Sequence, residues 1–296
     1  MRIAGPDDSG RAGHSARDLT VGEGQTRIMG VVNVTPDSFS DGGRFLDPAA
    51  AIEHGLALWR EGADILDVGG ESTRPGFDPV SVEEQKHRVL PVIEALREQC
   101  SVPIAVDTTR AEVAAAALEA GADWINDTTA LAGDPEMVHL AAKHGCPVVL
   151  MHSFNPSRNE GHGPNGRELV TQIVENLEAR VLFAESEGID PCRIILDPGL
   201  GFGTLFSDNL SVMANVGLFR RLQKPLLFGP SRKSFIGQMT GKPVEERLYG
   251  TAAAAAVLAF QGVEILRVHD VAATVDVVKV SDHLRKHGIE SRAHAG

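Results

Sequence analysis

The stretch Asp64-Ile65-Leu66-Asp67-Val68-Gly69, together with the residues that follow it, decides the fold. It is a short apolar run that ends in glycine, a pattern typical of a buried strand. After a loop come VEEQKHRVLPVIEALREQ at residues 82–99, whose length and Leu, Glu and Ala content predict a helix, and PIAVD at residues 103–107, which predicts a second strand. A strand, a helix and a strand in this order form the βαβ unit of a parallel sheet.

The same alternation extends along the chain from Arg27 onward. Strands are expected at residues 28–33, 64–69, 103–107, 124–126, 148–152, 193–197, 225–228 and 264–268. Helices are expected at residues 49–61, 82–99, 110–120, 135–143, 168–188, 210–222, 245–261 and 273–286. Eight strands, each followed by a helix, match the size and order of a TIM barrel. A doubly wound open sheet is the alternative, but it usually has fewer strands and one glycine-rich phosphate turn after its first strand.

We therefore predict an α/β protein with a single (β/α)8 TIM barrel over residues 27–288. Residues 1–26 contain five glycines, one proline and no aromatic side chain, so we expect them to form a flexible tail. Residues 289–296 are expected to be a short C-terminal tail.

Charge and cysteine content restrict the partners. The 296 residues include 28 Lys and Arg against 40 Asp and Glu, a formal net charge of −12, which argues against nucleic acid or an anionic membrane as the main partner. No apolar run reaches the roughly 18 residues of a membrane span, and no secretory signal is visible. The three widely spaced cysteines form no C-x-x-C pair. We therefore expect a reduced, cytoplasmic protein.

Polar side chains follow almost every expected strand. In a TIM barrel these strand ends meet at one mouth, where catalytic groups lie. Taken singly, each has a simpler explanation: Asp107 or Asp127 could cap the next helix, Asn126 could close a turn, and Arg74 could be a solvated surface charge. Chance would scatter such residues over both ends of the strands, so the set as a whole indicates a site.

The charges at this mouth predict the chemistry of the ligand. Its expected cations are Arg74, Arg232, Lys233, Arg267 and His269. Cations gathered in an acidic protein indicate an anionic group, most simply a phosphate or diphosphate. Its expected acceptors are Asp107, Asn126 and Asp197, which suit the N–H edge of a polar heterocycle.

The glycine series Gly199-Leu200-Gly201-Phe202-Gly203 follows a late strand and lacks the distal acidic residue of a dinucleotide fingerprint. We interpret it as a tight, mobile turn that aims Phe202 at a flat ligand, with a simple loop as the alternative. No zinc signature is present, and His152 could equally be a packed strand-end histidine. Magnesium could bind only through oxygen ligands such as Asn33 and substrate phosphates.

Five segments of the chain resemble the signatures of the dihydropteroate synthase family, in the same order as in that family. They are MGVVNVTPDSFSDGG at residues 29–43, DVGGESTRPG at 67–76, DPGLGFG at 197–203, SRK at 231–233 and RVH at 267–269. The resemblance implies a TIM barrel, usually homodimeric, that joins (7,8-dihydropterin-6-yl)methyl diphosphate to 4-aminobenzoate and releases 7,8-dihydropteroate and diphosphate in folate synthesis.

The resemblance also implies the role of each matched residue. The pterin would be held by Asp107, Asn126, Asp197 and Lys233, with Phe202 beside it. Magnesium would be coordinated by Asn33, and the diphosphate held by Thr73, Arg267 and His269. The aminobenzoate would be bordered by Phe39, Pro75, Ser231 and Arg232, with Arg74 also at the site. Asp107, Lys233 and Arg267 are the expected catalytic residues.

Three positions depart from the family pattern. Thr204 stands where a lysine is common, Asp208 where a histidine precedes the asparagine, and Pro230 where a small residue precedes Ser231. They leave room for a variant that tolerates sulfonamides, which resemble aminobenzoate. Thr204 and Asp208 also leave a catalytically silent pterin-binding paralogue open. A pterin-dependent methyltransferase domain is the other alternative, since it shares the barrel and the pterin carboxylates, but it would not need NVTPD at residues 33–37 or SRK at 231–233.

Overall fold

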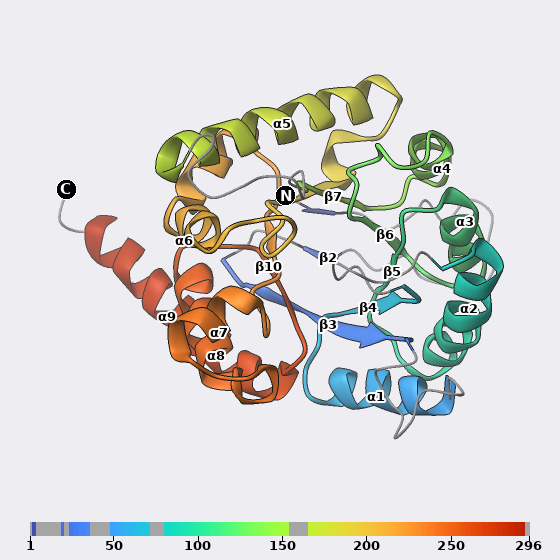
Figure 1. The fold of residues 1–296 in the computed structure, drawn as a ribbon, viewed down its shortest axis with the longest axis horizontal. Helices are drawn as coiled ribbons and strands as arrows, with labels where there is room; N and C mark the ends of the chain where they lie inside the picture. The colour runs from blue at the N-terminus through green and yellow to red at the C-terminus, as the bar shows by residue number, and fades with distance from the viewer. Residues whose placement is uncertain are drawn as a thin grey trace.

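In the computed structural model, residues 2–3, 19–20, 24–35, 48–71, 80–153 and 165–293 are described, and they form a barrel of parallel strands surrounded by helices (Figure 1). The barrel strands are β3 (Arg27–Asn33), β4 (Ile65–Gly69), β5 (Ile104–Asp107), β6 (Trp124–Asp127), β7 (Val148–Met151), β8 (Ile194–Asp197), β9 (Leu227–Phe228) and β10 (Ile265–Val268). Their order is β8-β7-β6-β5-β4-β3-β10-β9, and a parallel bridge from Leu196 to Leu226 links the two ends. The predicted TIM barrel is therefore confirmed.

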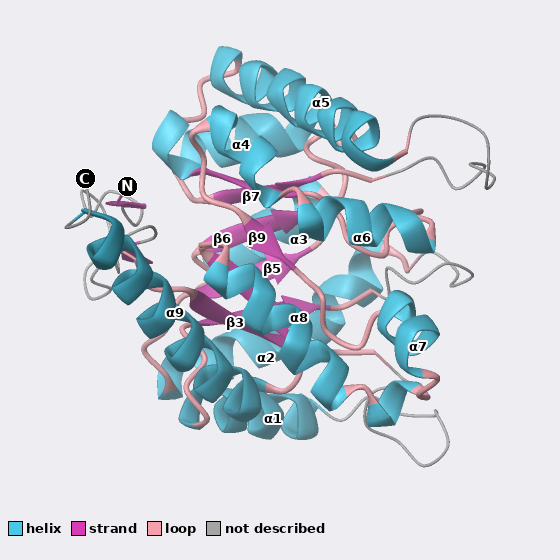
Figure 2. Cartoon of the chain, turned by 90° about the vertical axis from the view of Figure 1, so that its left-hand side faces the viewer, coloured by secondary structure: helices cyan, strands magenta, loops and turns pink. Residues whose placement is uncertain are grey.

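The helices follow the strands in the predicted alternation. They are α1 (Pro48–Arg60), α2 (Val82–Gln99), α3 (Ala111–Glu119), α4 (Glu136–His144), α5 (Gly166–Ser186), α6 (Phe206–Ala214), α7 (Ser234–Thr240), α8 (Leu248–Phe260) and α9 (Val271–Ala293). Figure 2 shows α7 at one end of the barrel and the last turns of α9 at the other. No helix in these described segments is both long and apolar enough to cross a membrane.

The alternation of side chains along each strand positions the site. One face of the strands forms an apolar layer inside the barrel, made of Met29, Ile65, Ala105, Trp124, Val149, Ile195, Leu227 and Ile265. Side chains two residues further on point to the same side of a strand. In four strands those residues are Asp67, Asp107, Asn126 and Asp197, and in β10 the residue is Arg267. The polar side chains of the mouth thus form the next layer above this apolar layer, toward the carboxyl ends of the strands.

Two helical segments differ from the prediction. The helix expected at 210–222 is instead α6 followed by a 3-10 helix at Val216–Leu222, since Asn215 and Gly217 are poor helix formers at the junction. The short helix α7 was not predicted; it begins after the extended Lys233 and ends at Gly241, whose φ is +70°. A residue with positive φ favours glycine and ends helices, which explains the stop.

The boundary expected at residue 26 also differs. Thr26 is 5% exposed and its backbone N–H donates to Asp282 Oδ2 of α9 at 2.7 Å. Thr26 is therefore part of the barrel, because a buried N–H needs an acceptor. Within the segment expected to be a tail, β1 (Arg2–Ile3) also pairs antiparallel with β2 (Leu19–Thr20). The flexibility of residues 1–26 as a whole stays a prediction. At the other end, α9 continues to Ala293, so the tail expected from residue 289 is helical up to that residue.

Candidate active site

A buried arginine lies at the centre of the barrel mouth. Arg267 Nε donates to Asp67 Oδ2 at 2.5 Å, and its Nη2 donates to Asp107 Oδ2 at 2.7 Å. Burial alone would lower the pKa of Arg267, but the two carboxylates outweigh that effect and raise it. The guanidinium is therefore permanently charged, and its two-pronged contacts fix its orientation.

Asp67 is a site residue that the sequence reasoning did not single out. Its side chain is fully buried, and besides Arg267 it accepts from Asn126 Nδ2, with N···O distances of 3.2 and 3.3 Å. A signal was present, because Asp67 is a charged residue inside an apolar strand, on the same face as Ile65. Since buried charges are rarely tolerated without partners, that position predicts a buried ion pair.

The two predicted pterin carboxyls are tuned by their surroundings. Burial raises the pKa of Asp197 to about 6, although the Gly199 N–H, which donates to Asp197 Oδ1 at 2.8 Å, and Lys233 oppose the rise. Burial also raises the pKa of Asp107, against the effect of Arg267 and with the help of Asp67. Both carboxyls thus gain or lose a proton much closer to neutrality than an exposed aspartate does.

The loop after β8 brings Phe202 to the mouth. Gly199 has a φ of +77°, and a Cβ atom there would lie 1.8 Å from the carbonyl oxygen of His152, so only glycine fits. The Lys233 ammonium, which comes from the loop after β9, lies 4.2 Å from the centre of the Phe202 ring. This distance is that of a cation–π contact, so the structure brings together two predicted residues from different loops.

The loop after β9 and the end of β10 form the next part of the rim. The backbone N–H of His269 donates to Ser231 Oγ at 3.2 Å, and His269 Nδ1 lies 2.9 Å from the same atom. Burial, together with Arg267 and Arg232, lowers the pKa of His269 to about 3. This environment disfavours the charged ring that the sequence predicts for His269, and the ring contacts Ser231 by a hydrogen bond.

Arg232 is held at the rim by an ion pair. Its Nε and Nη2 donate to the two carboxylate oxygens of Asp270 at 3.0 and 2.6 Å. Its φ is +56°, a region rarely adopted by residues other than glycine, and its backbone N–H donates to Thr251 Oγ1 at 3.1 Å. The surrounding contacts keep Arg232 in this unusual conformation.

Four predicted site residues, Phe39, Thr73, Arg74 and Pro75, lie outside the described residues. The other predicted residues, Asn33, Asp107, Asn126, Asp197, Phe202, Ser231, Arg232, Lys233, Arg267 and His269, all lie at the carboxyl ends of the strands or in the loops after them.

The described donors suit magnesium only in part. Over the described stretches, no three His, Cys, Asp or Glu side chains converge as a metal site. Asn33, half-buried at the end of β3, offers one amide oxygen, whereas Asp67 and Asp107 are engaged by Arg267. One neutral oxygen fits a magnesium ion whose other ligands are water and substrate phosphate oxygens, which is how this ion commonly binds.

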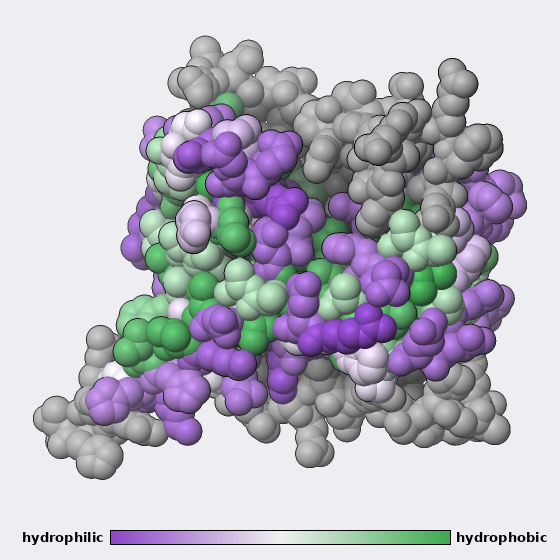
Figure 3. Space-filling view, turned by 90° about the horizontal axis from the view of Figure 1, so that it is seen from below, coloured by the Kyte–Doolittle hydropathy of each residue, from purple (hydrophilic) through white to green (hydrophobic). Residues whose placement is uncertain are grey.

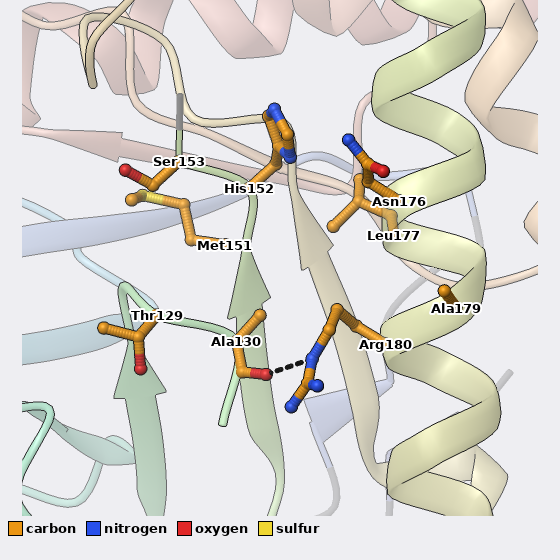
Figure 4. Close-up of a pocket in the computed structure, with 9 residues that line it drawn as sticks. All are labelled: Thr129, Ala130, Met151, His152, Ser153, Asn176, Leu177, Ala179 and Arg180. Atoms are coloured by element: carbon orange, nitrogen blue, oxygen red, sulfur yellow. Dashed lines mark hydrogen bonds between the residues drawn. The ribbon is translucent and has the colours of Figure 1, made fainter. Parts of the chain in front are cut away.

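A cavity of about 350 Å³ lies on the outer side of the strands, between the ends of β6 and β7 and helix α5 (Figure 4). Arg180 Nε donates to the carbonyl oxygen of Ala130 at 2.6 Å, and its guanidinium lies 4.4 Å from the ring centre of Phe183. Ala130 and Leu131 both have positive φ angles, of 52° and 63°. Arg180 therefore braces a strained turn behind the mouth.

Comparison with known proteins relates this geometry to a family. Residues 29–269 match the family described as pterin binding enzyme. The chain is 43% identical over 262 residues to the dihydropteroate synthase of Synechocystis sp., covering 88% of this chain and 90% of that protein.

Two solved structures are also similar. The dihydropteroate synthase of Xanthomonas albilineans, in complex with 7,8-dihydropteroate, has a TM-score of 0.83 and 42% identity, covering 96% of this chain and 99% of that one. The Yersinia pestis enzyme, in a sulfonamide drug complex, has a TM-score of 0.84 and 38% identity, covering 92% and 97%.

Proposed function

The chain belongs to the dihydropteroate synthase family, and from this premise we propose that it joins (7,8-dihydropterin-6-yl)methyl diphosphate to 4-aminobenzoate in folate synthesis. The observation that carries the proposal is the buried polar cluster of Asp67, Asp107, Asn126 and Arg267 at the barrel mouth, with Asp197 beside it. The carboxylates and the amide supply acceptors for the N–H groups of the pterin ring, and Arg267 supplies a fixed cation for the diphosphate. The ring and the diphosphate are the two ends of this substrate.

The reaction needs orientation and charge stabilisation more than an activated nucleophile. The bond between the pterin methylene carbon and the diphosphate oxygen breaks, and its electrons leave with the diphosphate. The amine nitrogen of aminobenzoate then bonds to that carbon and loses a proton. Asp197 would hold the N–H edge of the ring, while buried Arg267 and the neutral ring of His269 would hold the departing diphosphate.

Magnesium is part of the proposal, with Asn33 as its protein ligand. When bound, the ion would neutralise negative charge on the diphosphate. Calorimetric titration with magnesium, in the presence and absence of diphosphate, tests this role. Binding that depends on diphosphate and weakens in Asn33→Ala supports it, and unchanged binding in that variant contradicts it.

We propose that aminobenzoate lies against Ser231 and Arg232, with Phe39, Arg74 and Pro75 completing its border. A sulfonamide, which resembles aminobenzoate, would compete for the same place, and the similar Yersinia pestis enzyme is known in a sulfonamide drug complex. Thr204 and Asp208 bond to Gly201 and Leu205 in the loop that carries Phe202, so these two departures act on the pterin side. The inhibition constant of a sulfonamide against aminobenzoate then decides between a sensitive and a tolerant enzyme.

We also propose a homodimer formed through what we call the α8 face, which consists of Tyr249, Val257 and Phe260 on α8 and Met239 on α7. These side chains are 86%, 51%, 55% and 50% exposed. In Figure 3, hydrophobic areas are visible among polar ones on the side of the molecule where α1, α8 and α9 lie. Exposed apolar side chains gathered on one face indicate an interaction surface.

A cytoplasmic location is proposed as well, since the three cysteines are free thiols.

The test of the activity is direct. The purified protein is incubated with the pterin diphosphate, aminobenzoate and magnesium, and both diphosphate and dihydropteroate are measured. We expect equal amounts of the two products. Pterin binding without diphosphate release would instead identify a silent paralogue, and methyl transfer from a methylated folate would identify a methyltransferase.

A further inference from the structure

We propose that Thr204 is a positioning residue, whose hydroxyl fixes the loop that holds Phe202 and Lys233 against the pterin. The proposal rests on the proposed function, because it concerns the pterin half of the same site. It concerns a position at which this chain departs from its family pattern.

The hydroxyl of Thr204 belongs to a small network around one backbone N–H. The N–H of Gly201 donates both to Thr204 Oγ1 at 2.9 Å and to Asn209 Oδ1 at 2.8 Å. Thr204 Oγ1 itself donates to Asn209 Oδ1 at 3.0 Å. Asn209 is 2% exposed, and its Nδ2 donates to the carbonyl oxygen of Leu205 at 2.8 Å. The loop is thus tied to the first turn of α6 by side chains that have little freedom.

Asp208, the second departure, completes the same turn. Its Oδ2 accepts from the backbone N–H of Leu205 at 2.9 Å, and the residue is 1% exposed. Leu205 stands at the helix N-cap and has no side-chain acceptor of its own. The carboxylate near the helix N-terminus is also favourable for the helix dipole. The two departures therefore form one local arrangement with Asn209.

This network reaches the site through Gly201. Its φ is +78°, and a Cβ atom there would lie 2.8 Å from Cδ of Lys233, so the backbone packs directly against that side chain. The Lys233 ammonium in turn lies 4.2 Å from the Phe202 ring centre. Hydrogen bonds that hold the Gly201 N–H therefore also fix the backbone against which the Lys233 side chain packs. Loss of the Thr204 hydroxyl should loosen both side chains that face the pterin.

The experiment compares Thr204→Val, which keeps the shape but removes the hydroxyl, with Thr204→Ser, which keeps the hydroxyl. Losing one such hydrogen bond should weaken pterin binding by roughly threefold to tenfold in Thr204→Val, and Thr204→Ser should restore it. The KM for pterin diphosphate should rise by the same factor, while the KM for aminobenzoate stays unchanged. Thr171→Val is the matched control, because the Thr171 hydroxyl bonds to the carbonyl of Arg167 on an exposed helix face.

Two further measurements keep the test decisive. Amide hydrogen exchange at Gly201 should accelerate in Thr204→Val, and Thr204→Ala serves if the valine variant does not fold. Unchanged pterin affinity in a folded variant overturns the proposal, as does an equal loss for pterin and aminobenzoate. Pterin titration by calorimetry needs no turnover, so the outcome is independent of whether the wild-type protein makes dihydropteroate.

Discussion

Asp197 and Arg267 show that burial sets the chemistry of the site at the level of single residues. The same exclusion of water that raises the pKa of the Asp197 carboxyl to about 6 also strengthens the contacts between Arg267 and its two aspartates. On the protein surface, water would keep the carboxyl pKa near its usual value and would weaken the contacts between the arginine and its aspartates. Asp197 and Arg267 share this environment because both lie on the same apolar layer inside the barrel, which excludes water from their side chains.

The Asp197 carboxyl should make pterin binding depend on pH. The carboxylate accepts from the ring N–H edge, and it is charged above its pKa of about 6 and protonated below it. Affinity for the pterin should therefore be full above pH 7 and should fall as the pH drops through about 6. Asp197→Asn should lose roughly 1.5–3 kcal/mol of pterin binding at pH 7.5. Its affinity should fall less than that of the wild type as the pH drops through about 6, because, of the two predicted pterin carboxyls, only Asp107 still titrates in this range. Calorimetry from pH 5 to 8 measures both, and circular dichroism controls for folding. A wild-type affinity that stays flat over this range contradicts the assignment.

Arg267 and Lys233 should act at opposite ends of the substrate. Arg267→Lys keeps the charge but cannot reach Asp67 and Asp107 with two prongs, so it should weaken binding of free diphosphate by about tenfold or more. It should weaken binding of a pterin without diphosphate much less. Lys233→Met should do the reverse, since Lys233 lies against Phe202. If both variants lose the same affinity for both ligands, Arg267 and Lys233 line one shared pocket and do not bind separate ends of the substrate.

At the level of elements, the strands were predictable and the loops between them were not. A buried parallel strand such as Ile194–Asp197 is a short apolar run, and its polar last residue marks the mouth. The break of the 210–222 helix at Asn215 and the end of the short helix α7 at Gly241 depend on single residues of poor helix propensity, which alone do not fix where a helix ends. Asp67 could have been predicted from its place in the strand, whereas the lowered pKa of His269 could not, because it depends on burial beside Arg267.

The link between Thr26 and helix α9 should contribute to stability without affecting the site. Asp282 accepts from the Thr26 N–H at 2.7 Å and lies 3.0 Å from the Thr26 hydroxyl. Asp282→Ala leaves the buried N–H without this acceptor, so the free energy of unfolding should fall by about 1–3 kcal/mol. Asp276→Ala, an exposed position on the same helix, should change it by under about 0.5 kcal/mol. Urea unfolding measures both variants, and equal stabilities would show that the link contributes nothing.

At the level of the whole molecule, the acidic charge of −12 and the exposed α8 face have separate consequences. The charge repels polyanions, so the cations that bind an anionic substrate have to be gathered in the mouth. The α8 face consists of side chains at the ends of α7 and α8 that the described part of the chain leaves exposed. A second copy of the chain would remove this apolar area from water.

The α8 face should therefore determine whether the protein is a monomer or a dimer in solution. Light scattering should give about twice the chain mass of 31.5 kDa for the wild type. Tyr249→Lys combined with Phe260→Lys should give a monomer, because two charges would be buried without partners. Leu182→Lys, at a residue 62% exposed on α5, is the control and should stay dimeric. A dimer that survives the double change would place the interface elsewhere.

We infer that the two ends of one substrate bind on the two sides of this mouth. A crystal structure with the pterin diphosphate and aminobenzoate bound tests it most directly. We expect the ring N–H edge on Asp197, the diphosphate on Arg267 and His269, and the aminobenzoate beside Ser231. A pterin lying in the cavity beside α5, or a diphosphate held by Lys233 rather than by Arg267, would contradict it.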